Sequence, residues 1–262
     1  MVKFTPTPEQ TAIVTIAKES KKPFHVIARA GCAKTSTLGL IAAALPRQNI
    51  LALAFNKDIA TDMVDNFPSN VTPKTLNSFG LAAWKSHIGK WPKTHGGKLF
   101  FIIRDYIADL YTLNPDLASA LDEAKDDFKD FVNRAKSLGY LPEGIAGTTP
   151  LADYQSLVDS SDIEIPDEWE TPLNEILALS WTEALAGKLD FTDQIYCPVL
   201  AEVPFPIYDL ILIDEAQDLS SLDQKLLYLT ARLKSPRPIR VIVVGDPLQA
   251  IYAFRGADSS SM

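Results

Sequence analysis

The sequence has few cysteines, no long apolar run and no repetitive or Gly/Ser-rich tract. Its two cysteines, Cys32 and Cys197, lie too far apart for a local metal-binding motif and are too few to cross-link a secreted scaffold. No apolar run approaches the length of a membrane span, and residues 1–6 lack the cationic and apolar stretches of a secretion signal. We therefore expect reduced thiols, a cytoplasmic protein and no membrane partner.

Positive charge is also scarce, since the formal net charge is -8. A negative balance argues against a nucleic-acid partner, because phosphate backbones attract Lys and Arg. The charge is unevenly distributed, however. Residues 99–190 contain 19 acidic and 6 basic residues, which leaves 14 acidic and 19 basic residues elsewhere. The acidic excess is thus confined to the middle of the chain, and the flanking segments are net basic.

The hydrophobic pattern of the flanking segments predicts an α/β domain. With 47% hydrophobic and 22% charged residues, the 262-residue chain has the composition of an ordinary globular protein with one large or two modest domains. Short apolar runs predict strands, and 3.6-residue periodicity between them predicts helices. Such alternation is typical of a parallel sheet with helices on both faces. The expected strands are 24–28, 50–55, 210–213 and 240–244, and the expected helices are 9–20, 32–45 and 59–67.

The acidic middle of the chain has a different pattern. Apolar residues recur at helical spacing around 101–111, 117–138 and 173–185, and no strand is convincing between 98 and 187. We therefore predict one α/β domain, formed by residues 1–90 and 190–262, that is interrupted by a mostly helical, acidic insertion over residues 91–189.

A phosphate-binding loop is predicted between the first strand and the second helix. Val26 to Thr35 places a strand, a tight turn and Lys-Thr at the start of a helix. Backbone N–H groups there can surround a phosphate, Lys34 can neutralise its oxygens and the Thr35 hydroxyl can bind Mg²⁺. The outer two glycines of the usual G-x-x-x-x-G-K-[ST] pattern are Ala28 and Ala33, and alanine is tolerated where φ is negative. An ordinary strand-to-helix turn with a surface lysine is the alternative for this stretch alone.

Cys32 lies inside this turn, beside a helix N-terminus and Lys34. Such an environment favours a reactive thiol, which bound nucleotide should protect. The alternative is a buried, inert cysteine.

Paired carboxylates follow the apolar run 210–213. Asp214 and Glu215 lie where parallel sheets bind ligands, at the carboxyl end of a strand. Asp214 can hold Mg²⁺ through water, while Glu215 orients and activates the attacking water. Solvated acids that cap the next helix are the alternative.

The most specific stretch runs from Val244 to Ala257. Gln249 could contact a γ-phosphate, and Tyr252 and Phe254 could offer aromatic faces to unstacked bases. Alternatively, the two aromatic residues belong to the core.

Taken in order, these motifs resemble those of the UvrD/Rep-type superfamily 1 helicases. Thr7-Pro8-Glu9-Gln10 is similar to the adenine-reading motif, with Gln10 as the reader. Asp214–Asp218 is similar to D-E-x-Q-D, and Asp190–Asp193 to the D-F-x-D element that follows the inserted subdomain. The resemblance implies a RecA-like P-loop NTPase fold and catalytic roles for Lys34, Asp214, Glu215 and Gln249. It assigns nucleotide contacts to Gln10, Ala30, Gly31, Cys32, Ala33, Lys34, Thr35, Ser36 and Arg255, and Mg²⁺ to Thr35 and Asp214.

Two further elements resemble the family's single-strand DNA track. Phe55-Asn56-Lys57 is similar to motif Ia, and Thr75 to Phe79 is similar to T-x-H-S-F, with Asn77 in place of His. With the aromatic residues of the Val244–Ala257 stretch, the implied DNA-binding residues are Phe55, Asn56, Lys57, Thr75, Ser78, Tyr252 and Phe254.

The resemblance implies an ATP- and Mg²⁺-dependent DNA helicase or translocase that acts on single-stranded DNA and single-strand/duplex junctions in DNA repair or replication. The family's second motor domain, which carries the arginine fingers, is absent from these residues, so we expect this chain alone to be poorly active. A nucleotide switch that binds ATP and single-stranded DNA without moving is the alternative. A P-loop kinase would not explain Tyr252 to Arg255. The negative charge of the insertion argues against broad phosphate contact, and duplex DNA and a protein partner stay open as its contacts.

Overall fold

The computed structural model describes residues 5–29, 31–232 and 238–246. Contacts divide the chain into two compact units, which we call the sheet unit (Met1–Phe79 with Pro204–Met262) and the helical unit (Gly80–Val203). The helical unit extends beyond the predicted insertion 91–189 at both ends, because Trp84 packs on Trp181 at a centroid distance of 5.8 Å and residues 193–200 are wholly buried. No helix among the described residues is long and apolar enough to span a membrane.

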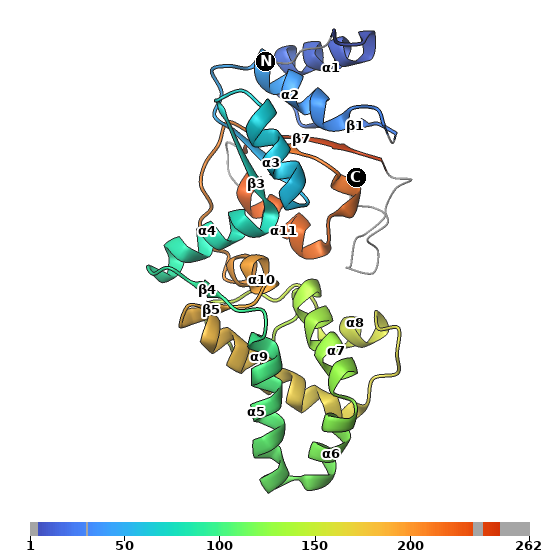
Figure 1. Cartoon of the computed structure of the whole chain (residues 1–262), viewed down its shortest axis with the longest axis vertical. Helices are drawn as coiled ribbons and strands as arrows, with labels where there is room; N and C mark the ends of the chain where they lie inside the picture. Colours follow the sequence, from blue (N-terminus) through green and yellow to red (C-terminus); the bar gives the residue numbers. More distant parts are fainter. Residues whose placement is uncertain (1–4, 30, 233–237, 247–262) are drawn as a thin grey trace. The chain divides into compact units, whose positions relative to one another are not determined.

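The sheet unit contains a five-stranded sheet in the order β1-β7-β6-β2-β3, and the four strand pairings in it are parallel (Figure 1). The predicted α/β class is confirmed. Because all five strands run the same way, their carboxyl ends lie along one edge, where loops from distant parts of the sequence meet. The strands are β1 (Phe24–Ile27), β2 (Ile50–Ala54), β3 (Val71–Thr75), β6 (Leu210–Ile213) and β7 (Arg240–Gly245).

Helices cover both faces of this sheet (Figure 1). One face carries the main core, in which Leu38, Ile41 and Met63 pack with alternate residues of the strands, such as Leu212 and Val244. The helices on this face are α1 (Pro8–Glu19), α2 (Lys34–Ala44) and α3 (Lys57–Asn66). The other face is covered by α11 (Ser221–Ala231), which follows the turn η2 (Ala216–Asp218), and by the start of α4 (Leu76–Ile88).

Strand β3 is the sheet element that the sequence analysis did not predict. It lies at an edge and pairs only with β2. Its sequence, Val-Thr-Pro-Lys-Thr, lacks a continuous apolar run and contains Pro73. Proline is tolerated in an edge strand because its missing N–H can face the side that pairs with no other strand.

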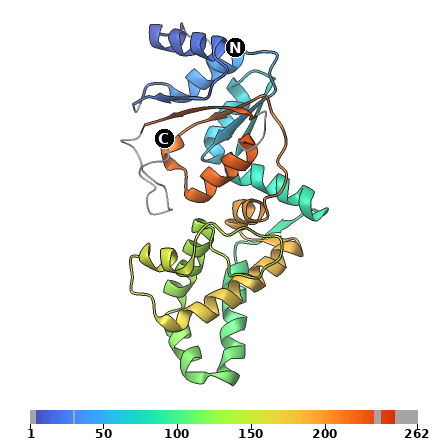
Figure 2. The same cartoon turned by 180° about the vertical axis from the view of Figure 1, so that it is seen from behind.

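The helical unit is built from antiparallel and crossing helices (Figure 2). The predicted helix 117–138 is wrong as one element, because α6 ends at Glu123 and α7 begins at Lys125. Just outside the region without predicted strands, two short parallel strands, β4 (Lys93–Thr94) and β5 (Lys188–Leu189), pair with each other. The remaining elements are α5 (Lys98–Leu113), α6 (Pro115–Glu123), α7 (Lys125–Leu138), α8 (Tyr154–Asp159), η1 (Asp167–Trp169), α9 (Glu170–Leu185) and α10 (Asp193–Leu200).

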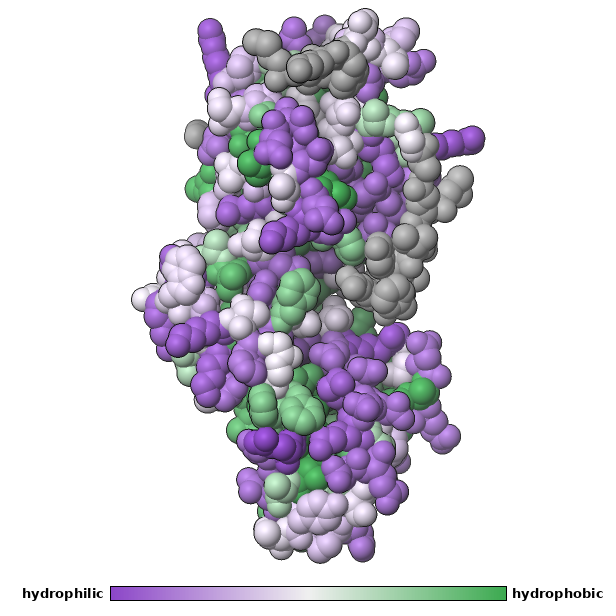
Figure 3. Space-filling model, viewed as in Figure 1, coloured by the Kyte–Doolittle hydropathy of each residue, from purple (hydrophilic) through white to green (hydrophobic). Residues whose placement is uncertain are grey.

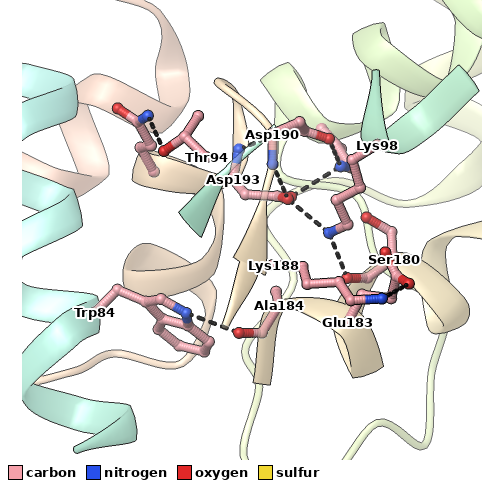
Figure 4. A network of polar contacts seen from close by, with 11 residues as sticks. Trp84, Thr94, Lys98, Ser180, Glu183, Ala184, Lys188, Asp190 and Asp193 are labelled. Carbon is pink, nitrogen blue, oxygen red and sulfur yellow. Dashed lines mark hydrogen bonds and ion pairs between the residues drawn. The ribbon is translucent and has the colours of Figure 1, made fainter. Parts of the chain in front are cut away.

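A buried ion cluster joins the beginning and the end of the helical unit (Figure 4). The Asp193 carboxylate accepts bonds from Lys98 Nζ at 2.7 Å and Lys136 Nζ at 2.8 Å, and Lys136 also pairs with Asp190 at 2.5 Å. Burial acts to lower the pKa of Lys136, but the carboxylates of Asp193 and Asp190 outweigh it and hold the pKa above its usual value. The two aspartates of the D-F-x-D element thus hold together three segments of this unit.

Candidate nucleotide site and DNA track

The predicted phosphate loop follows β1 at the carboxyl edge of the sheet. Ala28 donates its N–H to Gly245 O at 3.0 Å, and Cys32 donates to Arg29 O at 3.2 Å, so the turn is closed by backbone bonds. Gly31 has φ of 76°, a left-handed conformation that glycine adopts at low cost, and a Cβ there would meet nothing within 4 Å. The turn leads directly into α2, whose first residue is Lys34.

Ala33 departs from the expectation of a negative φ. It precedes α2 as the N-cap with φ of 50° and ψ of 47°, and no side chain caps the helix there. A Cβ in the left-handed region crowds the backbone, so this position favours the glycine that the usual pattern has. Ala28 is not among the residues with positive φ, so only the second substitution carries strain.

Two short contacts join the phosphate loop to the acidic strand end. Lys34 Nζ lies 2.6 Å from Glu215 Oε2, and the Thr35 hydroxyl donates to Asp214 Oδ2. Lys34 is buried, with 8% of its surface exposed. The loop after β1 and the end of β6 therefore bring a cation, a hydroxyl and two carboxylates together, as the motifs predict.

Asp214 and Glu215 differ in setting although they are adjacent. Asp214 is buried, its N–H donates to Leu53 O at 3.1 Å, and burial raises its pKa even though the Thr35 hydroxyl bond opposes the shift. Glu215 is more exposed and adopts a left-handed backbone with φ of 51°. A strained backbone at a strand end is common where a side chain is held for chemistry.

Gln217 is a residue of this site that the sequence analysis did not assign. Its Nε2 donates to Glu215 Oε2 at 2.8 Å, and its Oε1 accepts the N–H of Asp246 at 3.0 Å. The amide therefore connects the carboxylate after β6 to the turn after β7. The signal in the sequence that could have identified Gln217 is its position as the glutamine of D-E-x-Q-D.

Asp218, in the same turn, carries a buried carboxyl group. Burial and the nearby Glu215 carboxylate raise the pKa of Asp218 to about 6. Within the described part of the chain, its Oδ1 is buried and has no hydrogen-bond partner. Ionisation of this group is therefore costly.

Gln10 connects α1 to the helix that begins at the phosphate loop. Its side chain completes a capping box with Thr7, and its Nε2 donates to Thr37 Oγ1 at 3.1 Å. Thr37 in turn donates to Ala33 O. Both ends of the Gln10 amide are thus bonded within the protein, which fixes the side chain between the start of α1 and α2.

The described residues of the predicted DNA track lie at the ends of two adjacent strands. Ala54 pairs with Thr75 at the carboxyl ends of β2 and β3, so Phe55, Asn56 and Lys57 follow β2, while Thr75 ends β3 and Ser78 follows it. Asn56 caps α3 by accepting the N–H of Ile59 at 2.9 Å, and Lys57 and Ser78 are exposed.

The other predicted site residues are placed as follows. Ser36 lies in the first turn of α2, and Cys32 is an exposed free thiol, which excludes the buried alternative. Ala30, Gln249, Tyr252, Phe254 and Arg255 lie outside the described residues.

The geometry fits a bound Mg²⁺–nucleotide. Among the described residues, no group of three or more His, Cys, Asp or Glu side chains could hold a metal by itself. Thr35 and Asp214 contact each other and could both reach one cation, and Mg²⁺ is commonly bound by one or two protein oxygens together with phosphate oxygens.

Comparison with known proteins identifies the family of the chain. The model of the UvrD/REP helicase N-terminal domain matches residues 7–262. The chain belongs to this family. The match spans both the sheet unit and the helical unit, so the helical segment is also part of the UvrD/REP N-terminal domain.

Curated relatives are DNA helicases at modest identity. F-box DNA helicase protein 1 of Schizosaccharomyces pombe is 26% identical over 97% of this chain and 29% of its own length. The putative ATP-dependent DNA helicase YjcD of Bacillus subtilis is 25% identical over 92% and 32%, and the probable DNA helicase II homolog of Mycoplasma capricolum is 29% identical over 90% and 34%. The chain therefore spans about a third of the length of these relatives.

Proposed function

We propose that this chain supplies the Mg²⁺–ATP site and part of the single-strand DNA track of an ATP-dependent DNA helicase. The observation that carries the proposal is the meeting of Lys34 and Thr35, at the start of α2, with Glu215 and Asp214, at the end of β6. These are the groups that phosphoryl transfer to water requires.

The contacts suggest a division of labour. Lys34 would bind phosphate oxygens and in doing so exchange its partner Glu215 for the nucleotide. Glu215, released from Lys34 but still bonded to Gln217, would orient and deprotonate the attacking water. Thr35 and Asp214 would hold Mg²⁺, which supplies charge neutralisation on the phosphate oxygens when bound.

The DNA track belongs to the same edge of the sheet. Phe55, Lys57 and Ser78 follow strands β2 and β3, and β2 lies beside β6, which ends in the catalytic pair. Gln249, Tyr252, Phe254 and Arg255 are assigned to this proposal by sequence alone. A second motor domain and single-strand/duplex junctions are the proposed partners.

Two variants in the longest available form of the protein test the assignment. Lys34→Ala should weaken ATP binding, because the phosphate loses its cation, whereas Glu215→Gln should retain ATP and lose turnover. The measurements are nucleotide affinity by calorimetry and DNA-stimulated ATP hydrolysis. Asp209→Asn, which changes the charge at the opposite end of β6, is the control and should retain both activities. Equal loss of ATP binding in both site variants would contradict the separate roles.

DNA unwinding distinguishes a motor from a switch. The helicase proposal expects ATP-dependent strand separation that Glu215→Gln abolishes. ATP and single-strand DNA binding without separation by the unaltered full-length protein would instead identify a non-motor switch.

A further inference from the structure

The helical unit contains a cavity of about 760 Å³ beside the end of α7. It is lined by Tyr140, by residues 141–145, 148 and 150 of the following loop, by Ala152, by Asp153 and Tyr154 at the start of α8, and by Glu170 and Asn174 of α9. A volume of this size is typical of pockets that take drug-sized ligands, so the space suits a short peptide better than a single ion.

The wall formed by Tyr140 is firmly held. Gly139 ends α7 with φ of 75°, and a Cβ there would lie 2.9 Å from the Leu151 side chain, so the chain can pass this point only with glycine. Tyr140 donates its hydroxyl to Asn174 Oδ1 at 2.6 Å, and its carbonyl accepts the hydroxyl of Tyr196 at 2.7 Å. The cavity is therefore built into the fold rather than left between loose side chains.

Three carboxylates line this cavity together with two aromatic rings, and one of them, Asp153, caps α8 by accepting the N–H of Ser156 at 2.7 Å. Glu143, Asp153 and Glu170 line it, none of the described lining residues is basic, and none of these three carboxylates forms an ion pair within the described part of the chain. The rings of Tyr140 and Tyr154 lie 6.2 Å apart at 57°. Burial and the neighbouring Glu170 carboxylate raise the pKa of Tyr140 to about 12, as expected where negative charge faces the ring.

Carboxylates beside tyrosine rings favour a cation whose charged group is planar and can stack on a ring. Tyrosine faces attract cations, and a guanidinium also stacks on aromatic rings and presents a fork of donors to carboxylates, which an ammonium does not. The apolar residues Leu141 and Ile145 in the lining suit the aliphatic stem of such a side chain. The surface over α7 and α8 is largely hydrophilic on the face shown in Figure 3, and the polar side chains that line the cavity include three carboxylates.

We propose that this cavity binds an arginine side chain presented by a segment of a partner protein. The site is independent of the ATP site, because all its lining residues belong to the helical unit. The acidic excess of residues 99–190 would attract a basic segment and repel nucleic acid.

Peptide titration by NMR tests the proposal without nucleotide or DNA. The ¹⁵N-labelled chain is titrated with acetyl-Gly-Arg-Gly-amide and with the same peptide carrying citrulline, the neutral isostere of arginine. The arginine peptide should shift the amides of Gly144, Ile145 and Tyr154 saturably, whereas the amide of Gly89, a glycine of the same unit that does not line the cavity, should not shift. The citrulline peptide should produce no saturable shift.

Matched variants locate the binding. Glu170→Gln should weaken it up to about fivefold, the upper range for an exposed ion pair, and Glu143→Gln/Glu170→Gln should weaken it further. Glu123→Gln, the same change at an exposed position of α6, should leave the affinity unchanged. The proposal would be overturned if the citrulline peptide bound as tightly as the arginine peptide, or if the arginine peptide gave no saturable shift. It would also be overturned if Glu123→Gln weakened binding as much as Glu170→Gln, or if spermidine bound more tightly than the arginine peptide.

Discussion

Replacing Ala33 by glycine should stabilise the protein. A residue with a Cβ costs about 1–2 kcal/mol in the left-handed region, and the φ of 50° places Ala33 there. Glycine loses more backbone freedom than alanine on folding, and this cost of about 0.5–1 kcal/mol offsets part of the relieved strain. The net stabilisation should be about 0.5–1 kcal/mol, or roughly 1–4 °C in melting temperature for a chain of this size.

Scanning calorimetry without nucleotide measures this effect, and Arg232→Gly is the matched control. Arg232 ends α11 with φ of 54°, far along the chain from the phosphate loop, so its replacement should raise the melting temperature similarly. Only Ala33→Gly should alter ATP affinity, since only that residue lies beside Lys34. A lower melting temperature for Ala33→Gly, with the expected rise for Arg232→Gly, would refute the assignment of strain to this loop.

Three further outcomes follow from the site. Asp218→Asn should be more stable than the unaltered protein by about 1 kcal/mol above pH 6, because solvent screens part of the effect of the shift. The pKa of Asp218 in the folded state, about 6, lies above the ordinary value of 3.8. The free energy of unfolding of the unaltered protein therefore falls as the pH rises from about 3.8 to about 6, whereas that of the Asn variant does not. Denaturant midpoints measured from pH 3.5 to 7.5 would reveal the difference. Lys57→Ala should weaken single-strand DNA binding evenly across sequences and lower the slope of log affinity against log salt by about one. Lys21→Ala, at the amino edge of the sheet, should not, and equal effects would remove Lys57 from the track. Cys32 should be alkylated rapidly and protected by Mg²⁺–ATP, while Cys197, which is buried, should react only on unfolding. An unchanged rate at Cys32 in saturating nucleotide would contradict its place beside the phosphates.

The sheet could be predicted where strands are buried on both faces. Strands β2 and β6 are continuous apolar runs, Ile-Leu-Ala-Leu-Ala and Leu-Ile-Leu-Ile, and every residue in them is buried. The edge strand β3 could not be predicted, because its sequence, Val-Thr-Pro-Lys-Thr, contains no apolar run. The break at Ala124 was also missed, since apolar residues recur at helical spacing on both sides of it and no Pro or Gly marks it.

The meeting of Lys34 with Glu215 follows from sequence order, because loops after parallel strands share one edge. The link from Gln217 to Asp246 does not, since it depends on β6 and β7 being neighbours. Backbone conformation at Ala33 is equally hidden, because φ is set by the loop that surrounds the residue and alanine is compatible with most of its values.

The ion cluster of Lys98, Lys136, Asp190 and Asp193 bears on whether the helical unit can be replaced by another segment. Lys98 opens the first long helix of the helical unit, and the two aspartates lie near its end, where Gly80 also packs so closely on the Gln194 carbonyl that no larger residue fits. Gly80, where the chain enters this unit, and the segment around Asp193, near its end, are therefore held together by the unit's own contacts. A segment whose two ends are held close together by its own contacts has the property that makes domain insertion and replacement tolerated.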